Sequence, residues 1–166
     1  MRAPEESSSS KTLRAAPVFI TRPATQADIP AVLSLERALA NAAHWSEAAY
    51  SQIFAPDAPA RLAIVLEDKN RALCGFVIAR LIGGECELEN IAVAPTLQRK
   101  GAGTQLIEAL IASARVRNAR SIHLEVRESN TAARAFYLKR GFASRGRRPK
   151  YYSNPEEDGV LYSIQL

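Results

Sequence analysis

Short apolar runs, alternating with polar positions at 122–126, recur along the chain, and this pattern predicts the strands. The expected strands cover residues 18–20, 61–66, 73–82, 86–93, 122–126, 143–152 and 160–164. Short turns at Asp68-Lys69-Asn70 and at Gly83-Gly84 separate three consecutive members of this set. These three strands are therefore expected to form an antiparallel meander.

In four other segments the apolar residues recur with a helical period. They run from Ile29 to about Ala40, from Ser46 to Phe54, from Gly101 to Arg117 and from Ser129-Asn130 to Gly141. Thr25 to Asp28 supplies the start chemistry of the first helix, and Ser46 caps the second. The third helix has an apolar face made of Leu106, Ile107, Leu110, Ile111 and Ala114.

The order of these elements predicts the fold class. A strand, a loop, a helix and a second strand fill residues 86–126, and such a unit makes a right-handed crossover between parallel strands. Together with the meander, the crossover predicts an α/β fold with a mixed sheet covered by helices. We expect one domain over residues 17–166, preceded by a disordered, serine-rich tail at 1–16.

Composition narrows the class of protein without choosing a function. Of the 166 residues, 47% are apolar, and the first 16 lack the apolar core of a secretory signal. No run approaches the roughly 18 apolar residues of a membrane span, so we expect a cytoplasmic protein with no membrane partner. The net charge of +5 favours an anionic partner, which can be a polyphosphate cofactor, a ribosomal surface or a nucleic acid.

The cysteines and histidines do not predict a metal site. Cys74 and Cys86 lie in apolar, strand-like runs, where buried free thiols are expected. A zinc site needs about four ligands at characteristic spacing, and the sequence has neither a C-x-x-C motif nor paired histidines. No metal is therefore expected.

The segment from Gln98 to Gly103 carries a candidate anion site directly before the third helix. Backbone amides at a helix start bind anions, and Arg99 and Lys100 add positive charge to the same turn. A Walker loop is excluded because Lys100 precedes Gly101, and a dinucleotide fingerprint because Leu106 replaces its third glycine. A helix start that uses glycine only for its turn remains open.

Six further segments accompany this loop: Glu89-Asn90-Ile91-Ala92-Val93, Leu124-Glu125-Val126-Arg127, Ser129-Asn130, Phe136-Tyr137, Gly141-Phe142 and Tyr151-Tyr152. With them the chain resembles the GCN5-related N-acetyltransferase (GNAT) superfamily, whose acetyl-CoA loop has the pattern Q/R-x-x-G-x-G/A. The resemblance covers residues 19–166 and is greatest to the bacterial ribosomal-protein-alanine N-acetyltransferases. It implies a centrally splayed, mixed β-sheet flanked by helices, with acetyl-CoA as cosubstrate and its pantetheine arm in the splay.

The same resemblance implies the residues that hold acetyl-CoA. They are Ile91, Ala92, Val93, Gln98, Arg99, Lys100, Gly101, Ala102, Gly103, Thr104, Asn130 and Tyr137. A backbone N–H near Val93 is expected to meet the oxyanion formed at the thioester. Two roles remain open for Asn130, which can cap a helix or contact the pantetheine arm.

Acetyl transfer to an amine needs a base for the amine and a proton for the departing thiolate. Glu125 shares the polar face of its predicted strand with His123 and Arg127. The pattern alone favours a surface glutamate, whereas the resemblance implies that Glu125 is the general base. Tyr137 fits a core aromatic beside Phe136 by its pattern, and the resemblance implies that it is the general acid.

The pKa values of amines indicate which class of acceptor suits this chemistry. An N-terminal α-amine has a pKa of about 8 against about 10.4 for lysine, so near pH 7 it is neutral far more often and suits a single modest base. The candidate acceptor-binding residues are Glu89, Trp45, Tyr151 and Tyr152. An exposed strand charge is the competing interpretation of Glu89, and ordinary packing that of Trp45.

Four basic residues and no acid lie between positions 145 and 150. They fit a solvated face, a ribosome or RNA contact, or a contact to the CoA phosphates. Pro149 cannot donate a ladder hydrogen bond, so its strand is expected to be an edge strand or to be bulged there.

We therefore expect an acetyl-CoA-dependent transferase that acetylates a protein N-terminal α-amine. In the subfamily that the chain resembles, the acceptor is the N-terminal alanine of a small-subunit ribosomal protein. One alternative is a related acetyltransferase acting on a small amine or a lysine. Another is a non-catalytic module that binds CoA or RNA. The presence of both Glu125 and Tyr137 argues against such a module, and nucleic-acid binding is not expected.

Overall fold

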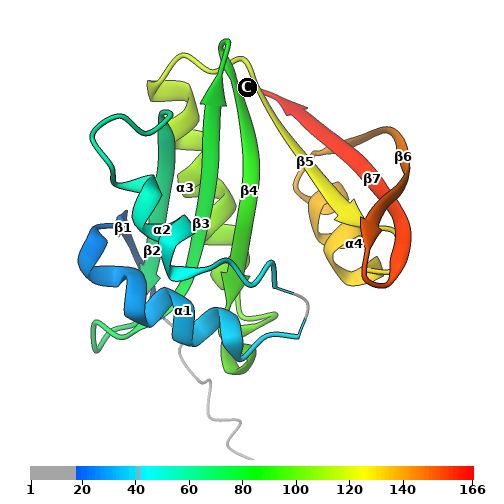
Figure 1. The fold of residues 1–166 in the computed structure, drawn as a ribbon. Helices are drawn as coiled ribbons and strands as arrows, with labels where there is room; N and C mark the ends of the chain where they lie inside the picture. The colour runs from blue at the N-terminus through cyan, green and yellow to red at the C-terminus, as the bar shows by residue number, and fades with distance from the viewer. Residues whose placement is uncertain (1–17, 41) are drawn as a thin grey trace, which may run out of the picture.

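The computed structural model describes residues 18–40 and 42–166, which form a sheet with helices on both faces (Figure 1). The strands are β1 (Ile20–Pro23), β2 (Arg61–Glu67), β3 (Leu73–Ile82), β4 (Glu85–Val93), β5 (Ser121–Arg127), β6 (Ala143–Ser153) and β7 (Glu156–Gln165). The helices are α1 (Ile29–Arg37), α2 (Glu47–Ile53), α3 (Ala102–Val116) and α4 (Thr131–Lys139), with 3₁₀ turns η1 (Gln26–Asp28) and η2 (Pro95–Leu97). The tail expected at 1–16 lies outside the described residues. Within the described ranges, no helix is both long and apolar enough to cross a bilayer.

The sheet is mixed and opens at its centre. Its seven strands in the described residues follow the order β1-β2-β3-β4-β5-β7-β6. β2, β3 and β4 form an antiparallel meander, and β4 and β5 are parallel, as predicted. In the part of the chain that the structure describes, only two residue pairs join β4 to β5: Cys86 with Ile122, and Glu87 with His123. Beyond these pairs β5 turns away from β4 together with β7 and β6, which confirms the central splay (Figure 1).

A hydrophobic layer lies on each face of the sheet. On one face α3 contributes Leu106, Ile107 and Leu110, whose side chains are fully buried. On the other face α1 and α2 cover β2 and β3 (Figure 1), where Tyr50 and Phe76 pack edge to face with ring centroids 6.2 Å apart. Each large apolar side chain removed from water contributes about 2 kcal/mol, so these layers fix the helices against the strands.

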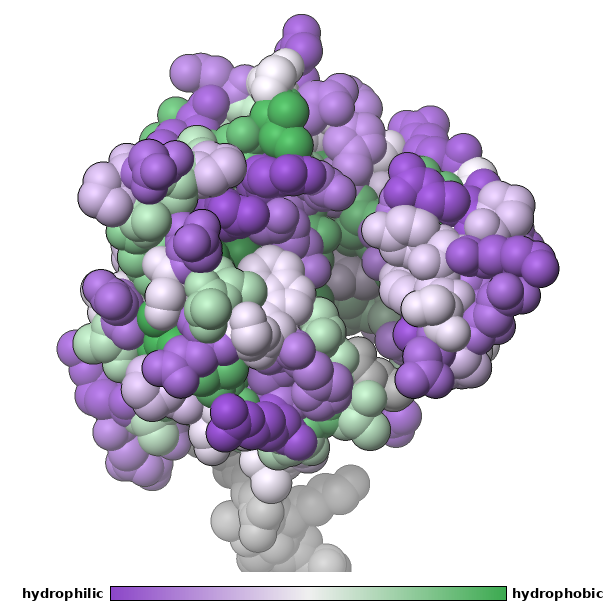
Figure 2. Space-filling model, in the orientation of Figure 1, coloured by the Kyte–Doolittle hydropathy of each residue, from purple (hydrophilic) through white to green (hydrophobic). Residues whose placement is uncertain are grey.

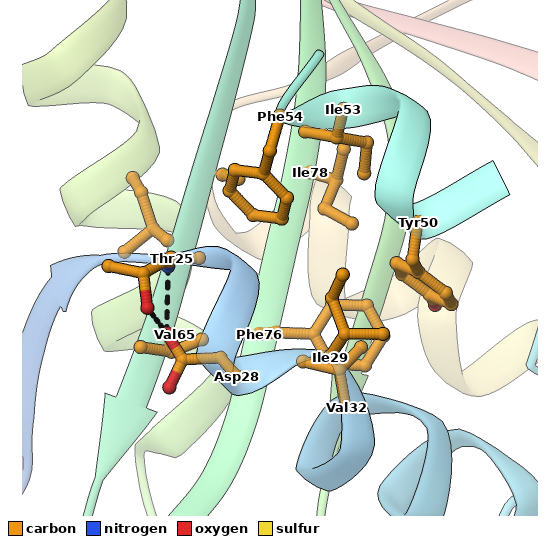
Figure 3. Close-up of a pocket in the computed structure, with 13 residues that line it drawn as sticks. Thr25, Asp28, Ile29, Val32, Tyr50, Ile53, Phe54, Val65, Phe76 and Ile78 are labelled. Carbon is orange, nitrogen blue, oxygen red and sulfur yellow. Dashed lines mark hydrogen bonds between the residues drawn. The ribbon is translucent and has the colours of Figure 1, made fainter. Parts of the chain in front are cut away.

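The chain enters the first helix through an ion-paired turn. The carboxylate of Asp28 accepts a hydrogen bond of 2.8 Å from the backbone N–H of Thr25, and the close-up in Figure 3 shows this contact. Arg22 donates to both oxygens of Asp28, at 2.9 and 2.7 Å. This pairing lowers the pKa of Asp28 from 3.8 to about 2, and the Arg22 hydrogen bond is the largest cause.

Several predicted boundaries differ from the structure. The first strand is Ile20–Pro23 rather than 18–20, because Arg22 pairs with Glu67 of β2 at 2.7 Å and so brings polar residues into this edge strand. α1 ends at Arg37, about three residues before the predicted end at Ala40. The chain leaves the helix through a tight turn in which the Leu39 N–H donates to the Glu36 carbonyl. β7 starts at Glu156 instead of 160, because Glu156 and Glu157 pair with β6.

The prediction for Pro149 is confirmed on both counts. β6, which holds it, is the last strand of the sheet. Its register with β7 also shifts between Arg148 and Tyr152, the stretch that contains the proline.

Candidate active site

The splay between β4 and β5 holds a large open cleft. Its volume is about 870 Å³, and its walls come from β4, β5, α4, β6, β7 and the 42–45 segment before α2. In the space-filling view it is the hollow between the body of the protein and the lobe that carries β6 and β7 (Figure 2). All of the predicted catalytic and acceptor residues line this cleft: Glu89, Trp45, Glu125, Tyr137, Tyr151 and Tyr152.

A second, smaller cavity lies between α1, α2 and the sheet. Its volume is about 20 Å³, and apolar side chains such as Ile29, Phe54 and Phe76 surround it (Figure 3). A void of this size and lining has neither the room nor the polar partners to hold a ligand. The wide cleft is therefore the candidate site.

The turn before α3 is built to face an anion. Gly101 has φ +89°, a left-handed conformation that L side chains rarely adopt, and Arg99 has φ +60°. No side chain caps α3, and the amides of Ala102, Gly103 and Thr104 have no acceptor in the described structure. These amides and the positive end of the helix dipole form an anion site at the end of β4.

Gly103, at the start of α3, lies against Phe136 of α4. A Cβ at this position would lie 3.4 Å from the Phe136 ring, which is an ordinary van der Waals contact, so the packing of α3 on α4 does not require a glycine here.

Arg140, at the end of α4, adds a cation that the sequence analysis missed. Its Nη2 donates to the hydroxyl of Thr104 at 2.5 Å, and its guanidinium lies 5.5 Å from the centroid of the Phe136 ring. In the sequence it is one of several basic residues near Gly141, so only the packing of α4 against α3 identifies it.

Ile91, Asn130 and Tyr137 are the predicted cofactor residues that line the cleft, whereas residues 98–104 lie outside its wall. Because the β4–β5 ladder of the described chain ends at Glu87 and His123, the β4 edge near Val93 faces no partner strand. This free edge fits the expected oxyanion contact. Asn130 caps α4, since its Oδ1 accepts from the Ala133 N–H at 3.1 Å, and it reaches the cleft as well.

Glu125 lies on β5 and faces the cleft with an 18% exposed side chain. Its Oε1 pairs with Nη1 of Arg148 at 2.9 Å, a partner that the sequence analysis did not identify. Its Oε2 is buried and has no hydrogen-bond partner among the described residues. The Glu125 carboxylate, followed by burial, raises the pKa of the neighbouring Tyr151 hydroxyl.

Tyr137 reaches the cleft from α4 and is almost fully buried. Its ring packs against Phe136, Phe142 and Tyr162, with centroids 5.3, 5.4 and 6.5 Å away. Burial raises the pKa of its hydroxyl well above the usual value of 10, so the phenol keeps its proton near neutral pH. The arrangement is compatible with both expected roles, because the side chain packs as a core aromatic and also lines the cleft.

The outer part of the cleft is aromatic and partly charged. Tyr151 and Tyr152 pack edge to face 5.0 Å apart, and Arg127 lies 4.2 Å from the centroid of the Tyr152 ring. Glu89 is held by Arg61 at 2.8 Å and lies 3.6 Å from Arg80. Its charge is therefore already balanced, which favours a structural role over attraction of an incoming ammonium.

The basic segment 145–150 forms an exposed face with acids opposite it. Arg147 pairs with Glu128, and Lys150 with Glu156 at 3.2 Å. Arg145 donates to the Ser163 hydroxyl at 2.8 Å and, like Arg148, lines the cleft. Most of the segment thus fits a solvated, ion-paired face.

Both cysteines are free and buried, as expected, and burial raises the pKa of each thiol to about 11. Residues 18–40 and 42–166 contain no group of three or more side chains that could hold a metal ion.

Comparison with known proteins agrees with this architecture. A model of the acetyltransferase (GNAT) family matches residues 30–142. Ribosomal protein bS18-alanine N-acetyltransferase of Escherichia coli K12 is 34% identical over 141 residues, which cover 84% of this chain and 92% of that protein. The protein of the same name from Haemophilus influenzae is 39% identical over 101 residues, covering 59% of this chain and 68% of that protein.

Solved structures show the same fold. The crystal structure of the ribosomal-protein-S18-alanine N-acetyltransferase from Escherichia coli superimposes with a TM-score of 0.77 at 30% identity, covering 90% of this chain and 94% of that one. Ard1 from Thermoplasma volcanium reaches the same TM-score at 23% identity, over 89% of this chain and 97% of that one. The chain therefore belongs to the GNAT acetyltransferase family and is an acetyl-CoA-dependent N-acetyltransferase.

Proposed function

We propose that this enzyme acetylates the N-terminal α-amine of a protein, and that its natural acceptor is the N-terminal alanine of ribosomal protein bS18. The observation that carries the proposal is the 34% identity to the Escherichia coli bS18-alanine N-acetyltransferase over 92% of that protein. The wide cleft supports it, because its open, aromatic outer part has room for the first residues of a polypeptide. An acceptor on the ribosome implies a cytoplasmic enzyme.

In the proposed reaction the neutral amine attacks the thioester carbonyl directly. Glu125 takes the amine proton, and Oε2 is the oxygen assigned to this step because it has no hydrogen-bond partner among the described side chains. Oε1 is held by Arg148, which fixes the orientation of the carboxylate. Since an α-amine has a pKa of about 8, a single carboxylate is a sufficient base.

The C–N bond then forms as the C–S bond breaks. The developing oxyanion is assigned to a backbone N–H on the free edge of β4 near Val93. Tyr137 gives its proton to the departing thiolate of CoA, and its raised pKa keeps that proton in place beforehand. The amine proton thus ends on Glu125 and the phenol proton on the CoA sulfur.

Acetyl-CoA binding is assigned to the start of α3 and to the inner wall of the cleft. The free amides of Ala102, Gly103 and Thr104 suit the diphosphate, and Arg99, Lys100 and Arg140 suit its negative charge. Ile91 and Asn130 are positioned in the cleft wall for the pantetheine arm. Residues 17–166 make up the catalytic domain in this proposal.

The test is thiol release from acetyl-CoA with a matched set of acceptors. One peptide carries the first residues of bS18, a second is the same peptide with its N-terminus blocked, and the third acceptor is a polyamine. Turnover with the free peptide alone supports the proposal. The blocked peptide keeps free lysine side chains, so turnover with it or with the polyamine would show that the enzyme acetylates another class of amine. Binding of acetyl-CoA without any transfer would favour a non-catalytic module.

A further inference from the structure

A buried carboxylate lies behind the acceptor side of the cleft and has no part in the reaction described above. Glu36 stands on the apolar face of α1, one turn after Val32 and Leu33, and is only 1% exposed. No basic side chain of the described chain lies within ion-pair distance of it. A carboxylate buried without a cation persists only where hydrogen-bond donors satisfy its oxygens.

Two hydrogen-bond donors reach Glu36, from separate parts of the chain. Nδ2 of Asn90, on β4, donates to Oε1 at 2.8 Å. The backbone N–H of Trp45, in the α1–α2 connection, donates to Oε2 at 3.0 Å. Tyr50 of α2 completes the group: it accepts from Asn90 at 3.1 Å, and burial followed by the Glu36 carboxylate raises the pKa of its hydroxyl.

Two of these partners form the wall of the cleft. Asn90, on β4, and Trp45, in the α1–α2 connection, both line it. The Trp45 ring also packs on Tyr50, with centroids 5.5 Å apart. The buried Glu36 side chain thus links Trp45, in the cleft wall, to Asn90 of the sheet.

The backbone beside Trp45 shows that this segment is held in place. His44 has φ +53°, a left-handed conformation that is unfavourable for a residue with a Cβ. Such a conformation persists where the surrounding contacts determine it. The hydrogen bond from the next amide, that of Trp45, to a buried carboxylate is a contact of this kind.

We propose that Glu36 is a positioning residue that sets the affinity of the enzyme for its acceptor. It touches neither acetyl-CoA nor the reacting amine, and it acts by holding Trp45 and Asn90 in the cleft wall. The inference rests on the proposed function in one respect: the acceptor must bind in the part of the cleft that Trp45 lines. It holds for whichever amine the enzyme uses.

The substitution Glu36→Gln tests the proposal with little change in shape. Both carboxylate oxygens accept hydrogen bonds, so a glutamine must turn its NH₂ group toward either the Trp45 N–H or the Asn90 amide. The matched control is Glu47→Gln, which removes an exposed carboxylate from the first turn of α2. We expect Glu36→Gln to raise the acceptor KM about tenfold while the KM for acetyl-CoA stays unchanged, and Glu47→Gln to alter neither.

A readout without any acceptor separates this proposal from the proposed function. Trp45 is the only tryptophan of the chain, so its fluorescence reports the position of this segment directly. Glu36→Gln should shift the emission to the red, as the ring becomes more exposed, at a temperature where the variant is fully folded. An unchanged emission and acceptor KM would overturn the proposal, and so would an equal rise in both KM values with a lowered melting temperature, which would mark a general structural role.

The wild-type enzyme provides a second test if the variant does not fold. The backbone amide of Trp45 should exchange with deuterium as slowly as the core amides of α1, because it is held by a buried carboxylate. Exchange at the rate of an exposed loop amide would overturn the proposal.

Discussion

Replacing Glu125 by glutamine is the most direct test of the active site. The amide cannot take a proton from the amine, and general-base catalysis contributes about 10²- to 10⁴-fold, so we expect kcat to fall by about that factor. The side chain keeps its shape, and acetyl-CoA is assigned to other residues. The KM for acetyl-CoA should therefore stay within about twofold of wild type.

The ion pair with Arg148 sets the expected cost in stability. At the observed 2.9 Å the gross Coulomb energy is about 1 kcal/mol at the dielectric constant of water and about 6 kcal/mol at an effective value of 20. The Arg148 side chain is 54% exposed, so solvent screening places the net contribution near the lower limit, at about 1 kcal/mol or less. The melting temperature should therefore change by only a few degrees.

The chain offers a matched control for this experiment. Glu128 also pairs with a β6 arginine, Arg147, but it does not line the cleft. Glu128→Gln therefore removes the same charge and a similar ion pair without touching the proposed base. The assay is thiol release at saturating acetyl-CoA from pH 6 to 9. A Glu125→Gln enzyme with kcat within threefold of wild type across this range would refute the assignment, and an equal loss in Glu128→Gln would assign the effect to the β6 hairpin.

Three further experiments test other parts of the structure. Tyr137→Phe keeps the buried ring and its aromatic contacts, so it should lower kcat about tenfold or more in single-turnover assays and leave the fold intact; full activity would mean that the thiolate leaves unassisted. Arg99→Glu and Lys100→Glu should each raise the KM for acetyl-CoA several-fold, with a weaker effect at high salt, whereas Arg115→Glu in the last turn of α3 should not. Asp28 has a pKa of about 2 in the folded protein and 3.8 as its ordinary value, so its ion pair stabilises the fold fully above about pH 4 and this stability is lost as the pH falls toward 2. In thermal melts from pH 7 to 2.5, the wild type should therefore lose about 1 to 2 kcal/mol more stability than Asp28→Asn, and parallel curves for the two proteins would show that the ion pair is not coupled to folding.

The periodic pattern of the chain predicts most of the fold because each element makes its own signal. The apolar run at 73–82 and the helical period before Arg117 match β3 and α3 closely. The boundaries that differ depend on distant residues. β1, for example, includes Arg22 because its side chain forms an ion pair with Glu67 of the next strand, and local periodicity contains no information about that pairing.

The candidate site was predictable where it depends on local motifs and on resemblance. The glycine turn before α3 can be identified from Gly101 and Gly103, whereas the splay of the sheet followed from the family resemblance alone. The contact between Arg148 and Glu125 could not be predicted, since it joins β6 to β5 across the intervening β7. Glu36 did leave a signal, because it is an acid on the apolar face of a predicted helix, but its partner Asn90 lies 54 positions away.

Three glutamates near the cleft show why their neighbours, rather than their residue type, decide their roles. Glu89 is matched by two arginines and is electrostatically satisfied. Glu36 has no cation in the described structure, and donors from β4 and from the α1–α2 connection engage both of its oxygens, so it is suited to hold other groups in place. Glu125 has one oxygen fixed by an arginine and a second that is buried without a partner among the described residues. Since a base needs both a fixed orientation and a free lone pair, Glu125 alone of these three is suited to take the proton from the amine.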